Sequence, residues 1–214
     1  MALLPKAIEN GFLKALDPLA AGLMRLGVKP NSITTISVLL LLLSGAAYAL
    51  DHLRTGALLL LSSGIFDLLD GKVARSARLE TRFGAFYDST MDRLGEAALF
   101  SGLGIYFMNA PGQRLPVLGL AMCFAALSCS FLVSYTRARA EGLGLDCKVG
   151  IARRAERFIV LGIPTAIWGP GNQGWMLLVI LTLLAGVAAI TTVQRISHVY
   201  RLTEADRRTA LKGT

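Results

Sequence analysis

Long stretches without a charged side chain constrain this fold more than any other feature of the sequence. Residues 30–50, 115–136 and 158–194 contain no Asp, Glu, Lys or Arg. The turn-forming segment GPGNQG at 169–174 divides the last stretch in two. Apolar runs of this kind are typical of helices that cross the ~30 Å hydrocarbon core of a bilayer. With 54% hydrophobic and 17% charged residues, the chain is too apolar for an ordinary soluble domain, and it is expected to be an all-α integral membrane protein.

Six membrane-spanning helices are expected in a single domain covering residues 1–214. Two further apolar segments, interrupted mainly by aspartates, lie between the uncharged runs. The expected spans are at about 31–50, 55–74, 83–108, 115–137, 155–169 and 174–195, followed by a cytoplasmic tail at 196–214. Residues 1–28 mix charged and apolar residues at helical spacing, which predicts an amphipathic helix in the membrane interface. Its lipid-facing side chains would be Ile8, Phe12, Leu13, Leu16 and Leu19.

The distribution of basic residues predicts the orientation of these spans. The net charge is +8, but the Lys and Arg residues gather before the first span, between the second and third, between the fourth and fifth, and after the sixth. The opposite side holds only Arg54 and Arg114. This asymmetry follows the positive-inside rule and predicts cytoplasmic termini in a cell membrane, with the basic surplus facing lipid headgroups and phosphorylated substrates rather than nucleic acid.

Four aspartates interrupt the second and third expected spans, within DLLDGKVARSARLETRFGAFYDSTMD at 67–92. Helical spacing places Asp67 and Asp70 on one face, and Asp88 and Asp92 on one face of the next helix. Carboxylates in a low-dielectric interior need partners, and hard divalent cations such as Mg²⁺ or Mn²⁺ prefer oxygen ligands. With Arg75 beside them to bind phosphate oxygens, the pattern indicates metal-dependent transfer at a phosphate. Arg93 and Glu96, one helical turn apart, are expected to form a structural pair.

The spacing D-x-x-D-G-x-x-A-R-x8-G-x-x-x-D-x-x-x-D resembles the signature of the CDP-alcohol phosphotransferase family at every specified position. The matching residues are Asp67, Asp70, Gly71, Ala74, Arg75, Gly84, Asp88 and Asp92. The resemblance implies a six-span membrane enzyme, typically a homodimer, that transfers a phosphatidyl or similar group from a CDP-linked lipid to an alcohol and releases CMP. The span count reached from hydropathy agrees with that fold.

The resemblance also implies roles for individual residues. Asp67, Asp70, Asp88 and Asp92 would bind two Mg²⁺ or Mn²⁺ ions, and Asp92 would also act as the general base. The donor nucleotide would be bound by Gly71, Arg75 and Thr81, together with Lys29, Pro30, Asn31 and Ser32 of the VKPNSITTIS segment. A Pro-Asn pair is also an ordinary helix start, so a capping role for Asn31 stays open.

A second stretch carries the acceptor prediction. SYTRARAE, the spacing G-x-x-x-R-x-E-R and VQRISHVY resemble the branch of the family that uses inositol phosphate as the acceptor, in ester or ether lipids. By this resemblance the acceptor phosphate would be bound by Ser134, Arg137, Arg154 and Arg195. Arg137 stands where that branch commonly has lysine, and Arg153 stands where an acidic residue is expected. The two cations differ in phosphate geometry, so both departures alter the predicted pocket.

Three alternatives stay open at this point. Glycerol 3-phosphate is also an anionic alcohol, so a phosphatidylglycerophosphate synthase fits the same catalytic residues. Intramembrane prenyltransferases use aspartate-rich motifs with Mg²⁺, but generally with more spans and different spacing. A non-enzymatic ion carrier could hold intramembrane carboxylates, although it would not need Arg75 beside them.

Overall fold

The structure is a computed structural model that describes residues 11, 13–151 and 154–212, with side chains described as far as residue 204. Within those residues every regular element is a helix, so the predicted all-α class is confirmed. The elements are α2 (Asp17–Arg25), α3 (Pro30–Ala49), α4 (Leu53–Ala77), α5 (Arg82–Asn109), α6 (Pro116–Gly142), α7 (Arg154–Trp168), the short 3₁₀ helix η1 (Asn172–Gly174) and α8 (Trp175–Lys212).

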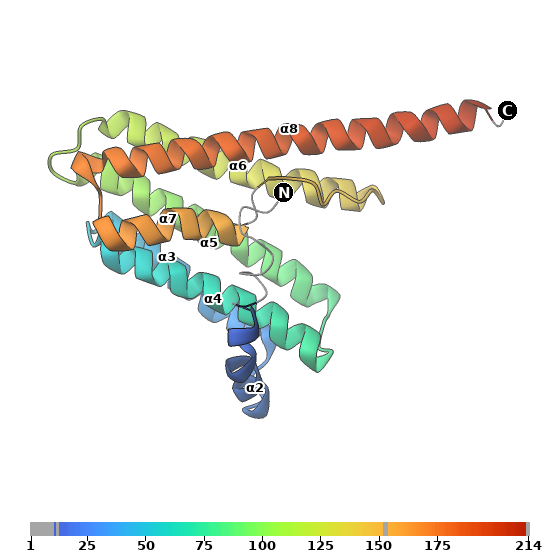
Figure 1. Cartoon of the computed structure of the whole chain (residues 1–214), viewed down its shortest axis with the longest axis horizontal. Helices are drawn as coiled ribbons and strands as arrows, with labels where there is room; N and C mark the ends of the chain where they lie inside the picture. Colours follow the sequence, from blue (N-terminus) through green and yellow to red (C-terminus); the bar gives the residue numbers. More distant parts are fainter. Residues whose placement is uncertain (1–10, 12, 152–153, 213–214) are drawn as a thin grey trace.

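Local sequence explains where these helices begin and end. Proline occupies the first turn of α3 and α6, where its missing N–H is no loss. α4 ends at Ala77, its C-cap residue Arg78 adopts a left-handed conformation (φ 54°), and Thr81 then caps α5. The GPGNQG segment ends α7 and precedes α8, as predicted. α8 continues without interruption through the predicted tail to Lys212 and extends beyond the other helices (Figure 1).

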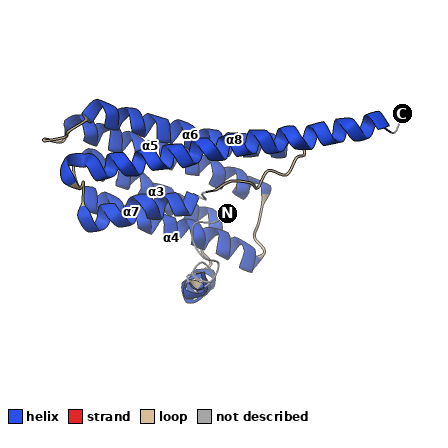
Figure 2. Cartoon of the chain, turned by 45° about the horizontal axis from the view of Figure 1, so that its top comes forward, coloured by secondary structure: helices blue, strands red, loops and turns tan. Residues whose placement is uncertain are grey.

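The long helices form a bundle in which α3 is central to one half. α3 packs against both α4 and α5, α5 also contacts α6, α6 packs along α8, and α7 lies against α4 (Figures 1 and 2). The α3–α5 contact is close because two glycines meet: a Cβ on Gly102 would lie 2.0 Å from the carbonyl oxygen of Gly45. Small residues at such crossings let helix backbones approach within a membrane. The contact fixes α5, and its aspartates, against α3.

The helix connections alternate between the two ends of the bundle. The α3–α4, α5–α6 and α7–α8 connections lie at one end, on the left of Figure 1, and the α4–α5 turn lies at the other. Of the described helices, α3, α6 and α8 are long and apolar enough to cross a membrane by length and composition. The chain is therefore a membrane protein, and at least some helices of its bundle can span the bilayer.

The N-terminal segment is attached to α3 and α4. Leu16, which we expected to face lipid, is instead buried with Ala20 against Ile33, Leu69 and Val73. That prediction was wrong because helical periodicity identifies an apolar face but not what covers it. Leu13 is half-buried and Leu19 is half exposed, and the remaining two expected lipid-facing residues, Ile8 and Phe12, lie outside the described residues.

Lys72 of α4 contacts the N-terminal segment. Its ammonium nitrogen lies 2.5 Å from Asp17 Oδ1 and also donates to the carbonyl oxygen of Leu13. Lys72 lies on α4 between the aspartate motif and the end of the helix, so the N-terminal segment rests against the helix that carries the site.

Candidate active site

Three of the four signature aspartates converge. Asp67 and Asp70 from α4 and Asp88 from α5 each offer a carboxylate oxygen, and these oxygens lie within 4.8 Å of one another. Asp70 is buried, whereas the other two are half-buried. Thr34 of α3 donates a hydrogen bond to Asp70 Oδ2 at 2.7 Å, which fixes the orientation of that carboxylate. Three helices thus contribute to one acidic cluster.

The acidic cluster fits a divalent cation. Asp88 Oδ1 is buried and has no hydrogen-bond partner among the described residues. A buried, unpartnered carboxylate oxygen beside two further carboxylates is costly in the absence of a cation. An all-oxygen donor set matches the preference of hard divalent ions. The predicted use of a divalent metal therefore agrees with the residues that the fold brings together.

Asp92 lies beside the acidic cluster, linked to it through an arginine. Arg154 Nη1, at the start of α7, lies 2.5 Å from Asp67 Oδ1 and 2.5 Å from Asp92 Oδ1. Arg93 also contacts Asp92, at 3.4 Å. The guanidinium of Arg154 is stacked over the Phe158 ring, 4.7 Å from its centroid. One predicted acceptor-binding residue therefore contacts both a predicted metal ligand, Asp67, and the predicted general base, Asp92.

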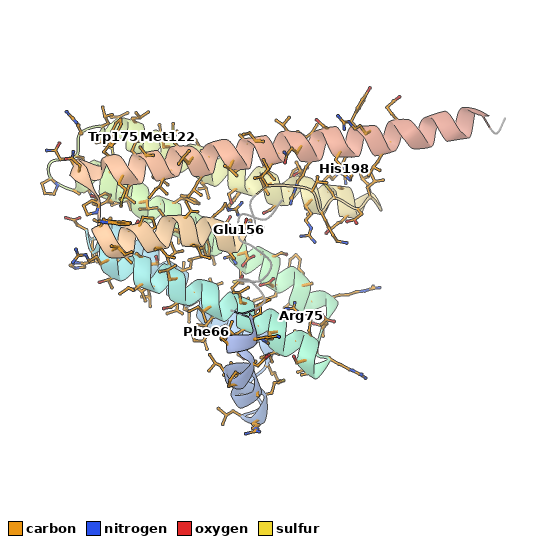
Figure 3. The ribbon with its side chains drawn as sticks, viewed as in Figure 1. Phe66, Arg75, Met122, Glu156, Trp175 and His198 are labelled. Carbon is orange, nitrogen blue, oxygen red and sulfur yellow. The ribbon has the colours of Figure 1, made fainter. Side chains whose placement is uncertain are left out.

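The predicted donor residues surround the same end of α4 and α5. Arg75, labelled in Figure 3 near the end of α4, is exposed, and no described residue forms an ion pair with it. A Cβ on Gly71 would lie 3.1 Å from an Arg75 guanidinium nitrogen, so glycine leaves room for this side chain. The Arg75 guanidinium is therefore positioned by the motif and is available to an anionic ligand.

The start of α3 and the start of α5 meet at Gly84. A Cβ on Gly84 would lie 3.0 Å from Thr81 Oγ1 and 3.3 Å from Asn31 Oδ1. Thr81 accepts a hydrogen bond from the Gly84 amide at 2.9 Å and caps α5. The cap position of α3 is Lys29, so Asn31 is not the N-cap, and Lys29 and Ser32 are exposed. Pro30, in the first turn of α3, completes this predicted set.

The remaining acceptor residues come from α6 and α8. Arg195 Nε donates to the Val149 carbonyl at 2.9 Å, and its Nη1 donates to the Val133 carbonyl, next to Ser134. Ser134 Oγ donates to the Ser130 carbonyl at 3.3 Å. Arg137 is paired with Glu141 at 2.8 Å on the exposed surface of α6. Arg195 and Ser134 are thus neighbours, whereas Arg154 lies against the carboxylates. Arg153 lies outside the described residues.

Glu96 is a residue of the site that sequence reasoning under-used. The expected contact with Arg93 is confirmed at 3.6 Å, but Glu96 also receives Ser130 Oγ at 2.6 Å and Arg157 Nη2 at 2.9 Å. It lies 3.5 Å from Arg154 Nε as well. Ser130, Arg157 and Arg154 are far from Glu96 in the sequence, so these contacts become visible only when the helices are packed together. The spacing of Asp88, Asp92 and Glu96 at successive turns was the one available signal.

Comparisons with known proteins agree with this geometry. The family model described as CDP-alcohol phosphatidyltransferase matches residues 28–197. The chain belongs to the CDP-alcohol phosphatidyltransferase family. It is therefore a transferase of membrane lipid metabolism, and membership sets aside the prenyltransferase and ion-carrier alternatives.

Curated relatives align with most of the length of this chain. An archaetidylinositol phosphate synthase of Methanothermobacter thermautotrophicus is 38% identical over 87% of this chain and 89% of its own length. A phosphatidylinositol phosphate synthase of Cutibacterium acnes is 37% identical over 91% of this chain and 96% of its own. Both names contain the same acceptor headgroup.

Solved structures of a further family member share the fold. A Mycobacterium tuberculosis phosphatidylinositol phosphate synthase in complex with manganese and citrate is similar with a TM-score of 0.75 and 32% identity, over 86% of this chain and 88% of that one. The same enzyme with CDP-DAG bound gives a TM-score of 0.73, over 86% of this chain and 92% of that one.

Proposed function

We propose that this transferase moves a phosphatidyl group from CDP-diacylglycerol, or its ether analogue, to the hydroxyl of inositol phosphate, giving phosphatidylinositol phosphate and CMP. The observation that carries the proposal is the position of Arg154, 2.5 Å from both Asp67 and Asp92. A guanidinium at the catalytic carboxylates suits an acceptor that carries its own phosphate. The names of the curated relatives support the same acceptor.

The donor is held at the open end of α4 and α5. Arg75 binds phosphate oxygens of the CDP moiety bidentately, and no described ion pair has to be broken for it to do so. Gly71 allows the close approach of the nucleotide. Thr81 and the segment from Lys29 through Pro30 and Asn31 to Ser32 line the other side, where Asn31 and Thr81 converge on Gly84.

Asp92 acts as the general base. Its carboxylate takes the proton from the acceptor hydroxyl, which then attacks the donor phosphorus and displaces CMP. Asp67, Asp70 and Asp88, together with Asp92, would hold two Mg²⁺ or Mn²⁺ ions, and the manganese complex of the tuberculosis enzyme supports a divalent metal in this family. When bound, these ions neutralise the pyrophosphate charge and make CMP a better leaving group.

The acceptor phosphate is bound by Arg154 and Arg195, with Ser134 and Arg137 on the adjoining turns of α6. Arg195 already lies beside Ser134 through its bond to the Val133 carbonyl. A dianionic acceptor draws these guanidinium groups together, because several cations at one site are costly unless an anion joins them. This selects inositol phosphate over neutral inositol.

The proposed membrane arrangement has six spans and two cytoplasmic termini. The positions of α3 to α8 at the six predicted segments, and the alternation of their connections between the two ends of the bundle, support this arrangement with the basic segments on the cytoplasmic side. The N-terminal segment lies in the cytoplasmic interface of the plasma membrane, next to the active site. As in the family that the signature resembles, two copies form a homodimer.

The experiment is CMP release by purified protein with CDP-diacylglycerol and Mg²⁺. The acceptors compared are inositol 1-phosphate, glycerol 3-phosphate, free inositol and serine, and an ether-linked CDP-lipid is run in parallel. Selective turnover with inositol 1-phosphate is the expected result. Selectivity for glycerol 3-phosphate would make the protein a phosphatidylglycerophosphate synthase and would contradict the proposed acceptor while leaving the catalytic site in place.

A further inference from the structure

Glu96 is a buried acidic side chain near the site with several charged and polar partners. It lies on α5 one helical turn after Asp92, and its side chain is 1% exposed. One oxygen accepts from Arg157 at 2.9 Å, and the other accepts from Ser130 at 2.6 Å and lies 3.6 Å from Arg93. These partners come from α5, α6 and α7. The carboxylate is therefore held in one position by three helices.

Arg154 connects Glu96 to the acidic cluster. Its Nη1 contacts both Asp67 and Asp92 at 2.5 Å, while its Nε lies 3.5 Å from Glu96 Oε1. That Nε is buried and has no hydrogen-bond partner in the part of the chain that the structure describes. Arg154 Nε, the inner nitrogen of the guanidinium, thus faces the fixed carboxylate of Glu96. Its outer nitrogen Nη1 faces Asp67, a proposed metal ligand, and Asp92, the proposed general base.

The two sides of Arg154 cannot be engaged in the same way once the proposed metal site is filled. If Asp67 and Asp92 held a divalent cation, its charge would neutralise these carboxylates and repel the guanidinium, so both contacts of Arg154 Nη1 would weaken. Glu96 is buried behind Arg154 and is surrounded by protein cations, so its charge remains directed at Arg154 Nε. Of the described carboxylates that contact Arg154, Glu96 is then the one that keeps this arginine at the site.

We propose that Glu96 is a positioning residue that retains Arg154 beside the catalytic carboxylates when these bind metal, leaving its outer nitrogens for the acceptor phosphate. The inference rests on the proposed function, because it assigns the phosphate of the acceptor to Arg154. Two consequences follow. Arg154 and the divalent cation compete for Asp67 and Asp92, and Glu96 shifts this competition toward the cation by giving Arg154 another partner.

The test compares full-length wild-type protein with Glu96→Gln, Arg154→Met and the double variant, all purified in detergent. Asp146→Asn serves as the control, because Asp146 is an exposed acid paired with Lys148 and has no ion pair with Arg154 or with another arginine that contacts Glu96. Mn²⁺ binding is measured by electron paramagnetic resonance without substrates, and KM and kcat are measured for each substrate. A thermal melt of each variant establishes that it is folded.

Glu96→Gln is expected to raise the acceptor KM by about tenfold or more, as loss of an outer-sphere partner typically does, with an unchanged donor KM. In this variant Arg154 has lost the Glu96 carboxylate, so it pairs more strongly with Asp67 and Asp92. Mn²⁺ is therefore expected to bind several-fold more weakly. Arg154→Met is expected to bind Mn²⁺ more tightly than wild type, and adding Glu96→Gln to it changes nothing further. Asp146→Asn matches wild type throughout.

Equal effects of Glu96→Gln on acceptor and donor KM, or weaker Mn²⁺ binding that persists in the Arg154→Met background, would overturn the proposal. If Glu96→Gln does not fold, Ser130→Ala removes one hydrogen bond from the same carboxylate and must raise the acceptor KM selectively, by a smaller factor. Failure of wild type to use inositol 1-phosphate would contradict the proposed function instead, and the substrate-free Mn²⁺ competition would still decide the role of Glu96.

Discussion

The acidic cluster of Asp67, Asp70 and Asp88 and the buried Glu96 lie within a few helical turns of each other, yet the protein satisfies them differently. Glu96 receives hydrogen bonds from Ser130 and Arg157, with further arginines around it. In the acidic cluster, Asp88 Oδ1 has no partner among the described residues. Acids that the fold neutralises itself hold helices together, whereas acids that it leaves unpartnered are kept for a ligand.

Metal removal should have the largest effect, because it acts directly on the acidic cluster, where Asp88 Oδ1 has no partner among the described residues. We expect EDTA to reduce CMP release to the background level and Mg²⁺ or Mn²⁺ to restore it, since the cluster then carries uncompensated charge against an anionic donor. The assay is CMP release before and after chelation and re-addition. Full activity in excess EDTA would contradict the assignment of the acidic cluster.

Asp92→Asn should come next in size. The amide preserves the shape of the side chain but cannot accept the acceptor's proton, so kcat should fall by about 10²- to 10⁴-fold, the usual contribution of a general base. Donor binding should be retained, as measured by CDP-diacylglycerol binding to the purified variant. Unchanged kcat in a folded variant would rule out Asp92 as the base.

Arg157→Met should reduce stability, because Arg157 is a partner of the buried acid Glu96. The change removes the 2.9 Å charged hydrogen bond to Glu96 and leaves part of a buried charge unpaired. We expect the free energy of unfolding to fall by about 3 kcal/mol, near the lower limit for breaking a buried pair, because other arginines remain. Reversible unfolding in mixed micelles would measure it, and a loss below experimental error would mean that the cluster around Glu96 does not stabilise the bundle.

Asp88→Asn should have the smallest and opposite effect on stability. Neutralising a buried oxygen that has no partner among the described residues removes an unfavourable charge, so the metal-free protein should gain about 1 kcal/mol while activity is lost. The same unfolding measurement, made in EDTA, tests this. A destabilised metal-free variant would indicate that Asp88 is satisfied by contacts beyond those described, and the contrast with Glu96 would disappear.

The helices and the acidic cluster followed from local sequence, because apolar runs, turn residues and the spacing of aspartates are properties of neighbouring positions. The placement of Asp67, Asp70 and Asp88 together needed only two adjacent helices joined by a short turn. The contacts of Thr34 with Asp70 and of Arg154 with Asp92 were beyond this reasoning, since they join residues far apart in the chain. So was the burial of Leu16, which depends on which helix its apolar face meets.

The order of the helices has a consequence for how the protein is made. The aspartates belong to α4 and α5, whereas Arg154 and Arg157 belong to α7 and are synthesised only after the whole of α6. At ribosomal rates of ~5–20 residues per second, this delay is on the order of seconds. During it the nascent spans carry acids whose arginines do not yet exist, and charge is costly within hydrocarbon. Those acids have to remain at the watery end of the bundle until α7 supplies Arg154 and Arg157, and α8, which carries Arg195, then completes the site.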